Sequence, residues 1–138
     1  AGSELDGRTI PYDNSLEGLV SKKKDFIGKR SLDRKAFVAE DRQKVVGVVP
    51  IDKKTSIPEG SHLVKDAKAP IPNPKLGYIS ASCWSVEYDN PFSLAILKDG
   101  KNMIGQKLFA MSPLKNKTIP VEIVSSHYVD PKGKRVRS

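Results

Sequence analysis

The stretch from Leu76 to Lys98 constrains the fold of this chain more than any other part of the sequence. Its first half alternates as the side chains of a pleated strand do. Asp89-Asn90-Pro91 then has turn chemistry, and the apolar run over 92–97 is too short for a helix but long enough for a buried strand. We therefore predict a hairpin of two neighbouring strands. In its first strand, one face is predicted to carry Tyr78, Ser80, Ser82 and Trp84, and the other face Ile79, Ala81 and Cys83.

Further short strands are predicted on both sides of this hairpin. Residues 45–49 are rich in β-branched side chains, and segments at 61–64, 105–111 and 117–124 follow, with glycine, proline or asparagine at the joints. The small residues of the hairpin suit a tightly curved sheet because they let backbones approach closely. The pattern predicts a mainly β fold: a six-stranded antiparallel Greek-key barrel over residues 43–130.

The chain before the barrel has another pattern. Residues 1–27 are poor in apolar side chains and contain Pro11, which favours extended backbone at Ile10, so we predict an extended linker. Residues 28–42 are predicted to form one amphipathic helix over 28–39 and a connector, because Leu32, Ala36 and Ala39 recur at helical spacing. Residues 131–138 form a basic tail.

The net charge of +8 is concentrated in two segments. Residues 22–44 carry nine bases and four acids, and the chain after Asp130 carries four bases and no acid. Such patches attract anions of many kinds, from phosphate backbones to acidic protein surfaces. No apolar run approaches the roughly 20 residues of a membrane span, no secretory signal is visible, and the single cysteine is typical of a reducing compartment. We expect a cytoplasmic protein that does not bind a membrane.

No catalytic constellation can be assembled from these residues. Cys83 is interpreted as a buried, inert thiol and Trp84 as a core plug or an interface anchor. His62 is expected at the surface, and His127 either makes a structural hydrogen bond or touches a ligand. The two histidines stand far apart with no thiolate beside them, so we expect no metal site and no catalytic residue in this chain.

Six strings of the sequence are informative: DGRTIP at 6–11, SKKKDFIGKRSL at 21–32, DRQKVVG at 41–47, IPEG at 57–60, GYISAS at 77–82 and HYVDPKGKR at 127–135. Together they resemble the carboxy-terminal part of the alpha subunit of heterotetrameric sarcosine oxidase. SKKKDFIGKRSL also distinguishes this subunit from the broader glycine-cleavage aminomethyltransferase family, to which the chain is similar. After residue 77 the family has a small turn with glycine, whereas this chain has Asp89-Asn90-Pro91-Phe92.

This resemblance implies a terminal barrel that packs against a folate-binding domain of the same subunit, to which the linker would connect it. The alpha subunit binds tetrahydrofolate and captures the one-carbon unit of oxidised sarcosine as methylenetetrahydrofolate. FAD, FMN and NAD are expected elsewhere in the intact complex, with other sarcosine oxidase subunits as partners. The fragment alone is expected to be inactive. We call HYVDPKGKR at 127–135 the closing motif. Its residues Arg135 and Tyr128 are expected near the folate, where an arginine can pair with the glutamate carboxylate of folate.

Two alternatives stay open at this point. A basic barrel of short strands also describes a nucleic-acid-binding module. Such barrels display several aromatic side chains for base stacking, whereas Phe37, Trp84, Phe92 and Phe109 are expected in the core here. We therefore do not expect nucleic acid as the partner. The other alternative is a purely structural docking domain, with residues 22–44 binding an acidic subunit.

Overall fold

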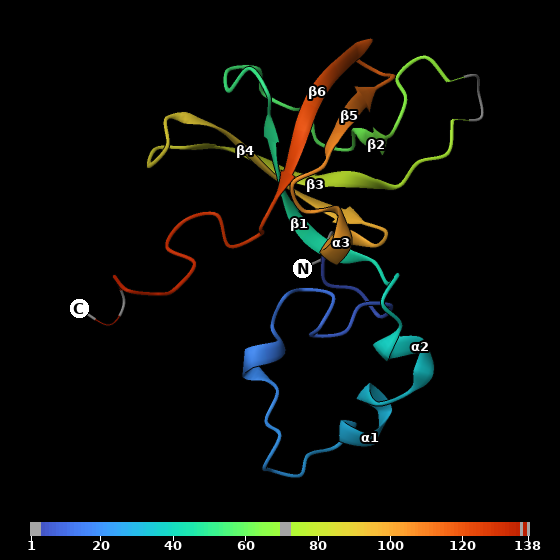
Figure 1. Cartoon of the computed structure of the whole chain (residues 1–138), viewed down its shortest axis with the longest axis vertical. Coiled ribbons are helices and arrows are strands. Elements are labelled where there is room, and N and C mark those ends of the chain that lie inside the picture. The colour runs from blue at the N-terminus through green and yellow to red at the C-terminus, as the bar shows by residue number, and fades with distance from the viewer. Residues whose placement is uncertain (1–3, 70–72, 136, 138) are drawn as a thin grey trace.

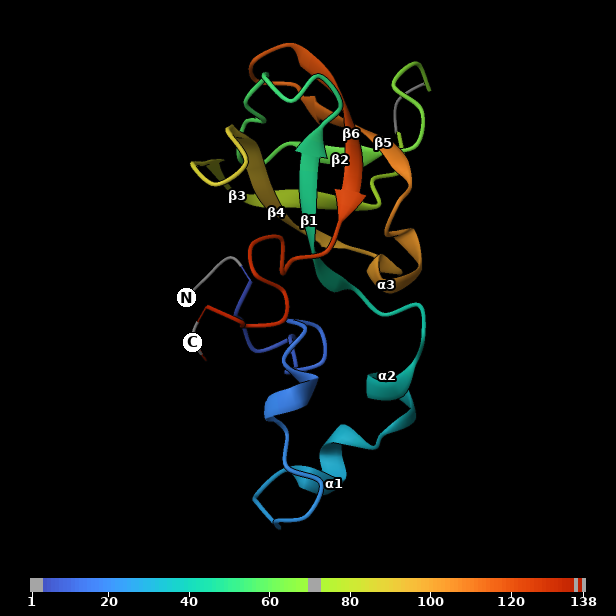
Figure 2. The same ribbon diagram turned by 60° about the vertical axis from the view of Figure 1, so that its left-hand side comes forward.

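A closed barrel of antiparallel strands lies above an irregular N-terminal lobe, residues 4–43 (Figure 1). The computed structural model describes residues 4–69, 73–135 and 137. Residues 1–3 of the predicted linker and residues 136 and 138 of the predicted tail lie outside the described residues. Figure 2 shows the lobe extending away from one end of the barrel.

Six strands close the barrel in the order β1-β4-β3-β2-β5-β6, so the predicted fold class is confirmed. Because β6 pairs with β1, every strand has two neighbours and no edge is left open. The predicted hairpin of β3 and β4 and the predicted last strand are confirmed. The strands are β1 (Lys44–Pro50), β2 (His62–Val64), β3 (Gly77–Ser85), β4 (Asn90–Leu97), β5 (Lys107–Ser112) and β6 (Lys117–Val124).

The core draws side chains from all six strands. Met103, from the short helix α3 (Gly100–Met103), also reaches it. The chain thus contains a complete hydrophobic core of its own. The core residues are Val46, Val48, Ile57, Leu63, Ile79, Ala95, Leu97, Met103, Leu108, Ala110, Ile119, Val121 and Ile123.

A β-bulge in β3 changes which side chains face the interior. Ile79 pairs with Ala95 and Ala81 pairs with Leu94, which leaves Ser80 as the extra residue. An extra residue reverses the alternation, so the buried side of the strand changes after Ile79. The hairpin then runs beyond the barrel, as Figure 1 shows.

Three predictions of burial were therefore wrong. Cys83 was placed on the same face as Ile79, but the bulge turns it outward and its thiol is exposed. Trp84 is 53% exposed and does not fill the core, because it lies on the projecting part of the hairpin. Phe37, Phe92 and Phe109 are only half-buried and do not belong to the core cluster.

The lobe contains no long helix, so the single helix predicted over 28–39 was wrong. In its place lie α1 (Lys29–Leu32) and α2 (Lys35–Val38), separated where Arg34 adopts an extended conformation with ψ of 140°. Neither helix buries a residue, and helices this short need tertiary packing to extend. A 3₁₀ turn, η1 (Glu17–Leu19), precedes them. None of the helices in the described part of the chain has the length and apolarity that a membrane crossing requires.

Candidate functional site

The segment after β6 folds against the projecting end of the β3–β4 hairpin. The ring of Tyr128 stacks on Phe92, with ring centroids 4.7 Å apart and an interplanar angle of 12°. Its other neighbour is Tyr88, at 4.6 Å and 53°. Stacked and tilted pairs at these distances are favourable aromatic geometries. We call Tyr88, Phe92 and Tyr128 the aromatic cluster.

Hydrogen bonds fix the orientation of Tyr128 within this cluster. The hydroxyl of Tyr88 donates to the carbonyl oxygen of Tyr128 at 3.3 Å, and Nδ2 of Asn90 donates to the Tyr128 hydroxyl oxygen at 3.3 Å. Asn90 is 4% exposed, and its Oδ1 has no hydrogen-bond partner among the described residues. A buried, unpaired amide oxygen is costly, so this corner has an acceptor that a donor could still satisfy.

Arg135 forms a two-pronged pair with Glu87 in the hairpin turn. Nη1 donates to Oε2 at 3.1 Å and Nη2 donates to Oε1 at 2.5 Å. The hydrogen bond to Arg135 lowers the pKa of Glu87, and the same bond raises the pKa of Arg135. The guanidinium fork predicted to bind an external carboxylate therefore holds an internal one.

Asp130 shapes the chain that presents Arg135. This aspartate has a positive φ of 44°, and its carboxylate accepts the backbone N–H groups of Lys134 and Arg135 at 2.9 Å each. These two backbone hydrogen bonds lower the pKa of Asp130, and the one from Arg135 has the larger effect. The turn brings Arg135 back toward the hairpin end where Tyr128 lies. The two residues predicted from the closing motif thus come to the same end of the molecule.

Two residues of this region were missed by sequence reasoning. Glu87 lies 48 positions from Arg135, and no local pattern announces a pair at that distance. Asn90 was read only as a turn residue. One signal in the sequence pointed to this region, namely the departure from the family pattern at 89–92. Two residues of that segment, Asn90 and Phe92, contact Tyr128.

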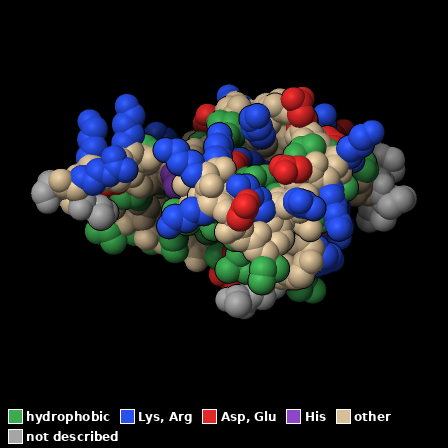
Figure 3. Space-filling model, turned by 90° about the horizontal axis from the view of Figure 1, so that it is seen from below, with side chains coloured by type: hydrophobic (Ala, Val, Ile, Leu, Met, Phe, Trp, Pro, Cys, Tyr) green, Lys and Arg blue, Asp and Glu red, His purple; other side chains and the backbone are tan. Residues whose placement is uncertain are grey.

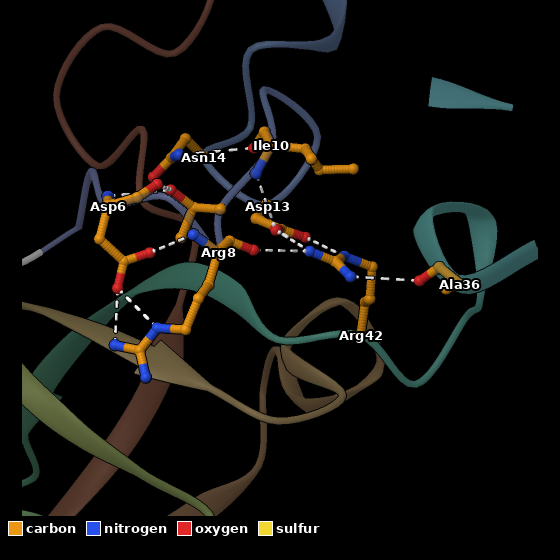
Figure 4. Close-up of polar contacts among 8 residues, drawn as sticks. Asp6, Arg8, Ile10, Asp13, Asn14, Ala36 and Arg42 are labelled. Carbon is orange, nitrogen blue, oxygen red and sulfur yellow. Dashed lines mark hydrogen bonds and ion pairs between the residues drawn. The ribbon is translucent and has the colours of Figure 1, made fainter. Parts of the chain in front are cut away.

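A second polar centre lies within the N-terminal lobe, close to the barrel (Figure 4). Nε and Nη2 of Arg42 donate to the carboxylate of Asp13 at 2.7 and 2.5 Å, and further donor groups reach the carbonyl oxygens of Arg8 and Ala36. The guanidinium carbon of Arg42 also lies 5.1 Å from the centre of the Phe37 ring. The hydrogen bond to Asp13 has the largest influence on the pKa of Arg42, and it raises this pKa.

Clefts open on both sides of Arg42. One, of about 460 Å³, runs between the lobe and α3 and includes Tyr12, Phe37 and Lys101. The other, of about 470 Å³, lies over β3 and β4 and includes Lys75, Tyr78 and Lys98. Both have a size that suits small molecules. Arg42 and Gln43 line both clefts.

The histidines and the cysteine do not come together. His127 is exposed, and its backbone N–H donates to Ser125 Oγ at 3.2 Å, while His62 lies half-buried on β2. Among the described residues, no group of three or more histidine, cysteine, aspartate or glutamate side chains could hold a metal ion.

The arrangement of the barrel matches a known fold. The structure superimposes on the crystal structure of glycine cleavage system aminomethyltransferase T from Bartonella henselae with a TM-score of 0.68 and 20% sequence identity. The match covers 94% of this chain and 34% of that protein. The chain therefore has the barrel fold found in an aminomethyltransferase. No protein-family profile matches the sequence.

Sequence comparison narrows this class. The chain is 34% identical to the sarcosine oxidase alpha subunit of Rhizobium meliloti (strain 1021) and 37% identical to that of Corynebacterium sp. (strain U-96). Each match extends over 136 residues, which is 97% of this chain, and the chain spans 14% of the length of these relatives. This protein is a homologue of one region of the sarcosine oxidase alpha subunits, as the strings in its sequence predict.

Proposed function

We propose that this chain is the terminal barrel region of a sarcosine oxidase alpha subunit and helps to close its tetrahydrofolate site. There the one-carbon unit of oxidised sarcosine would be captured as methylenetetrahydrofolate. The observation that carries the assignment is sequence similarity over 97% of the chain to the alpha subunits of such oxidases. The barrel fold shared with an aminomethyltransferase supports the folate role.

Arg135 and Tyr128 are the residues that we propose lie near the folate. A guanidinium fork that already holds the Glu87 carboxylate has the geometry to hold a glutamate carboxylate of folate. The aromatic cluster beside it offers an apolar, half-buried surface, and Asn90 offers an unpaired acceptor. The catalytic residues and the sites for FAD, FMN and NAD would lie in other parts of the oxidase, so the isolated chain would not turn over sarcosine.

The proposed partners are the remainder of the same subunit and the other subunits of the oxidase. The domain division that follows is a linker over 1–27, a connector over 28–42, the barrel over 43–130 and the basic tail. We expect the coding region upstream of residue 1 to encode a folate-binding domain. A coding region without one would overturn the proposed function.

The complete oxidase that carries this sequence tests the folate role directly. We expect Arg135→Ala to weaken tetrahydrofolate binding and to increase the share of one-carbon units released as formaldehyde, while the rate of sarcosine oxidation stays unchanged. Lys132→Ala is the matched control, because it removes an exposed charge from the same tail. Unchanged folate affinity in Arg135→Ala would remove Arg135 from the site. A wild-type complex that does not oxidise sarcosine would refute the assignment as a whole.

A further inference from the structure

The end of the lobe farthest from the barrel exposes two large apolar side chains in succession. Phe26 is 41% exposed and Ile27 is 105% exposed, which is unusual for neighbouring residues of this size. They precede α1, which Figure 2 places at the tip of the lobe. Leu19 and Val38, on the same lobe, are 80% and 55% exposed. We call residues 21–29 the tip loop.

The tip loop is held in place by the ammonium group of Lys29. Nζ donates to the carbonyl oxygens of Lys22 at 3.1 Å and Lys24 at 2.9 Å, and it lies 3.4 Å from Oδ1 of Asp25. Gly28, with φ of 93°, makes the turn in which the N–H of Lys29 donates to the carbonyl oxygen of Phe26. The loop therefore presents its apolar side chains from an ordered backbone, although it is exposed.

Order of this kind favours a role in binding. An anchor that is already fixed loses little conformational entropy when it enters a pocket, and large buried side chains carry most of the binding energy of an interface. Several large apolar side chains exposed on one lobe among polar residues mark an interaction site more often than a single exposed residue does. The exposed pair thus has the character of a preformed anchor.

The charge around the anchor indicates the chemistry of the surface that it fits. Residues 22–35 carry seven basic and two acidic side chains. Figure 3, which views the molecule from below, shows lysine and arginine side chains interspersed with apolar ones on this face. A complementary surface would be an apolar pocket with carboxylates around its rim.

We propose that the tip loop docks into a carboxylate-rimmed apolar pocket on a neighbouring part of the oxidase, with Ile27 as the anchor and Lys29 as a positioning residue. This inference rests on the proposed function, which supplies the complex. The chain spans 14% of its relatives, so most of the surface of such an oxidase lies outside this structure. A membrane surface fits less well, because interfacial binding uses an extended amphipathic helix and α1 and α2 have four residues each.

Limited trypsin digestion tests this docking. Lys22, Lys23 and Lys24 are exposed, so the isolated chain, which has its own complete core, should be cut there readily. In the complete oxidase we expect cleavage at these lysines to be at least tenfold slower. Ile27→Asp in the complete oxidase should restore fast cleavage. The matched control is Leu114→Asp, since Leu114 is 101% exposed on the barrel and lies outside the tip loop.

Lys29 has a separate test. Lys29→Ala should loosen the tip loop, and so speed its cleavage in the isolated chain and reduce its protection in the oxidase. Lys29→Arg, which keeps a donor cation, should restore part of that protection. Cleavage of the isolated chain at the wild-type rate after Lys29→Ala would refute the positioning role.

Three outcomes would overturn the docking itself. The first is equal cleavage of the tip loop in the isolated chain and in an oxidase that turns over sarcosine, which would leave the proposed function intact. The second is protection that survives Ile27→Asp. The third is Ile27-dependent binding of the isolated chain to phosphatidylserine vesicles, which would assign the loop to a membrane. Absence of sarcosine turnover by the wild-type complex would instead refute the proposed function, and with it the partner.

Discussion

The carboxylate of Asp13 receives two hydrogen bonds from the guanidinium of Arg42, 29 positions further along the chain, at 2.5 and 2.7 Å. Asp13 is 3% exposed, and its carbonyl oxygen accepts the backbone N–H of Val45 at the start of β1. One residue of the predicted linker thus binds both the connector and the first barrel strand. The N-terminal segment is therefore fastened to the barrel by specific polar contacts, which an extended linker would not require.

We expect Asp13→Ala to destabilise the fold, because it leaves the partly buried guanidinium of Arg42 without its carboxylate. The expected loss is about 2 kcal/mol in the free energy of unfolding, below the range for fully buried pairs because Arg42 keeps some contact with water. Urea unfolding at pH 7 measures this loss. Asp33→Asn, at an exposed aspartate of the same lobe, should change the free energy little. Equal stability of the two variants would show that the pair does not hold the lobe.

The strands of the barrel could be predicted because their signals are local. Alternation, β-branched residues and turn residues act over a few positions, and β6 begins and ends where the pattern of 117–124 predicts. The bulge at Ser80 could not be predicted in this way. One extra residue in Ser80-Ala81-Ser82 leaves the composition of a strand unchanged, but it decides which face Cys83 takes.

The candidate site was predictable only in part. Arg135 and Tyr128 were found through a resemblance in the closing motif, while their partners Glu87 and Asn90 depend on how the tail crosses the hairpin. The helix over 28–39 failed for a related reason. Helical spacing of apolar residues predicts a helix when a core receives them, and the lobe offers these residues no core.

Gly77 is expected to tolerate no side chain. A Cβ atom at this position would lie 2.1 Å from the carbonyl oxygen of Ile96 and 2.9 Å from Cα of Leu97, both of which belong to the paired strand β4. Backbone atoms cannot move aside as a flexible side chain can, so Gly77→Ala should cost about 3 kcal/mol or more. Thermal unfolding measures the cost. Gly7→Ala is the control, because its Cβ would meet nothing within 4 Å, and a similar loss there would contradict the steric argument.

Asp52 makes stability depend on acid pH. The carboxylate of Asp52 accepts hydrogen bonds from the hydroxyl of Thr55, from the backbone N–H of Thr55 and from the backbone N–H of Lys54, in decreasing order of influence. These hydrogen bonds lower the pKa of Asp52 from 3.8 to about 2. Because Asp52 has its lower pKa in the folded state, its carboxylate stabilises the folded state. This contribution to the free energy of unfolding is complete above pH 3.8 and is lost as the pH falls through about 2. NMR titration of the Asp52 carboxyl carbon should show a higher midpoint in Thr55→Val. Midpoints that coincide would mean that the hydroxyl has no influence.

The internal pair of Glu87 and Arg135 should compete with any carboxylate ligand of the tail. Because the ligand must displace Glu87 from both arms of the fork, Glu87→Gln should raise the affinity of the complete oxidase for tetrahydrofolate, by up to about fivefold for an exposed pair. Equilibrium dialysis at low salt measures the change, which should shrink as salt screens the pair. Asp89→Asn is the matched control, since it removes an acid from the same turn, and Asn tolerates the positive φ of 49° there. If both variants raised affinity equally, general charge would explain the effect, and displacement of Glu87 would not.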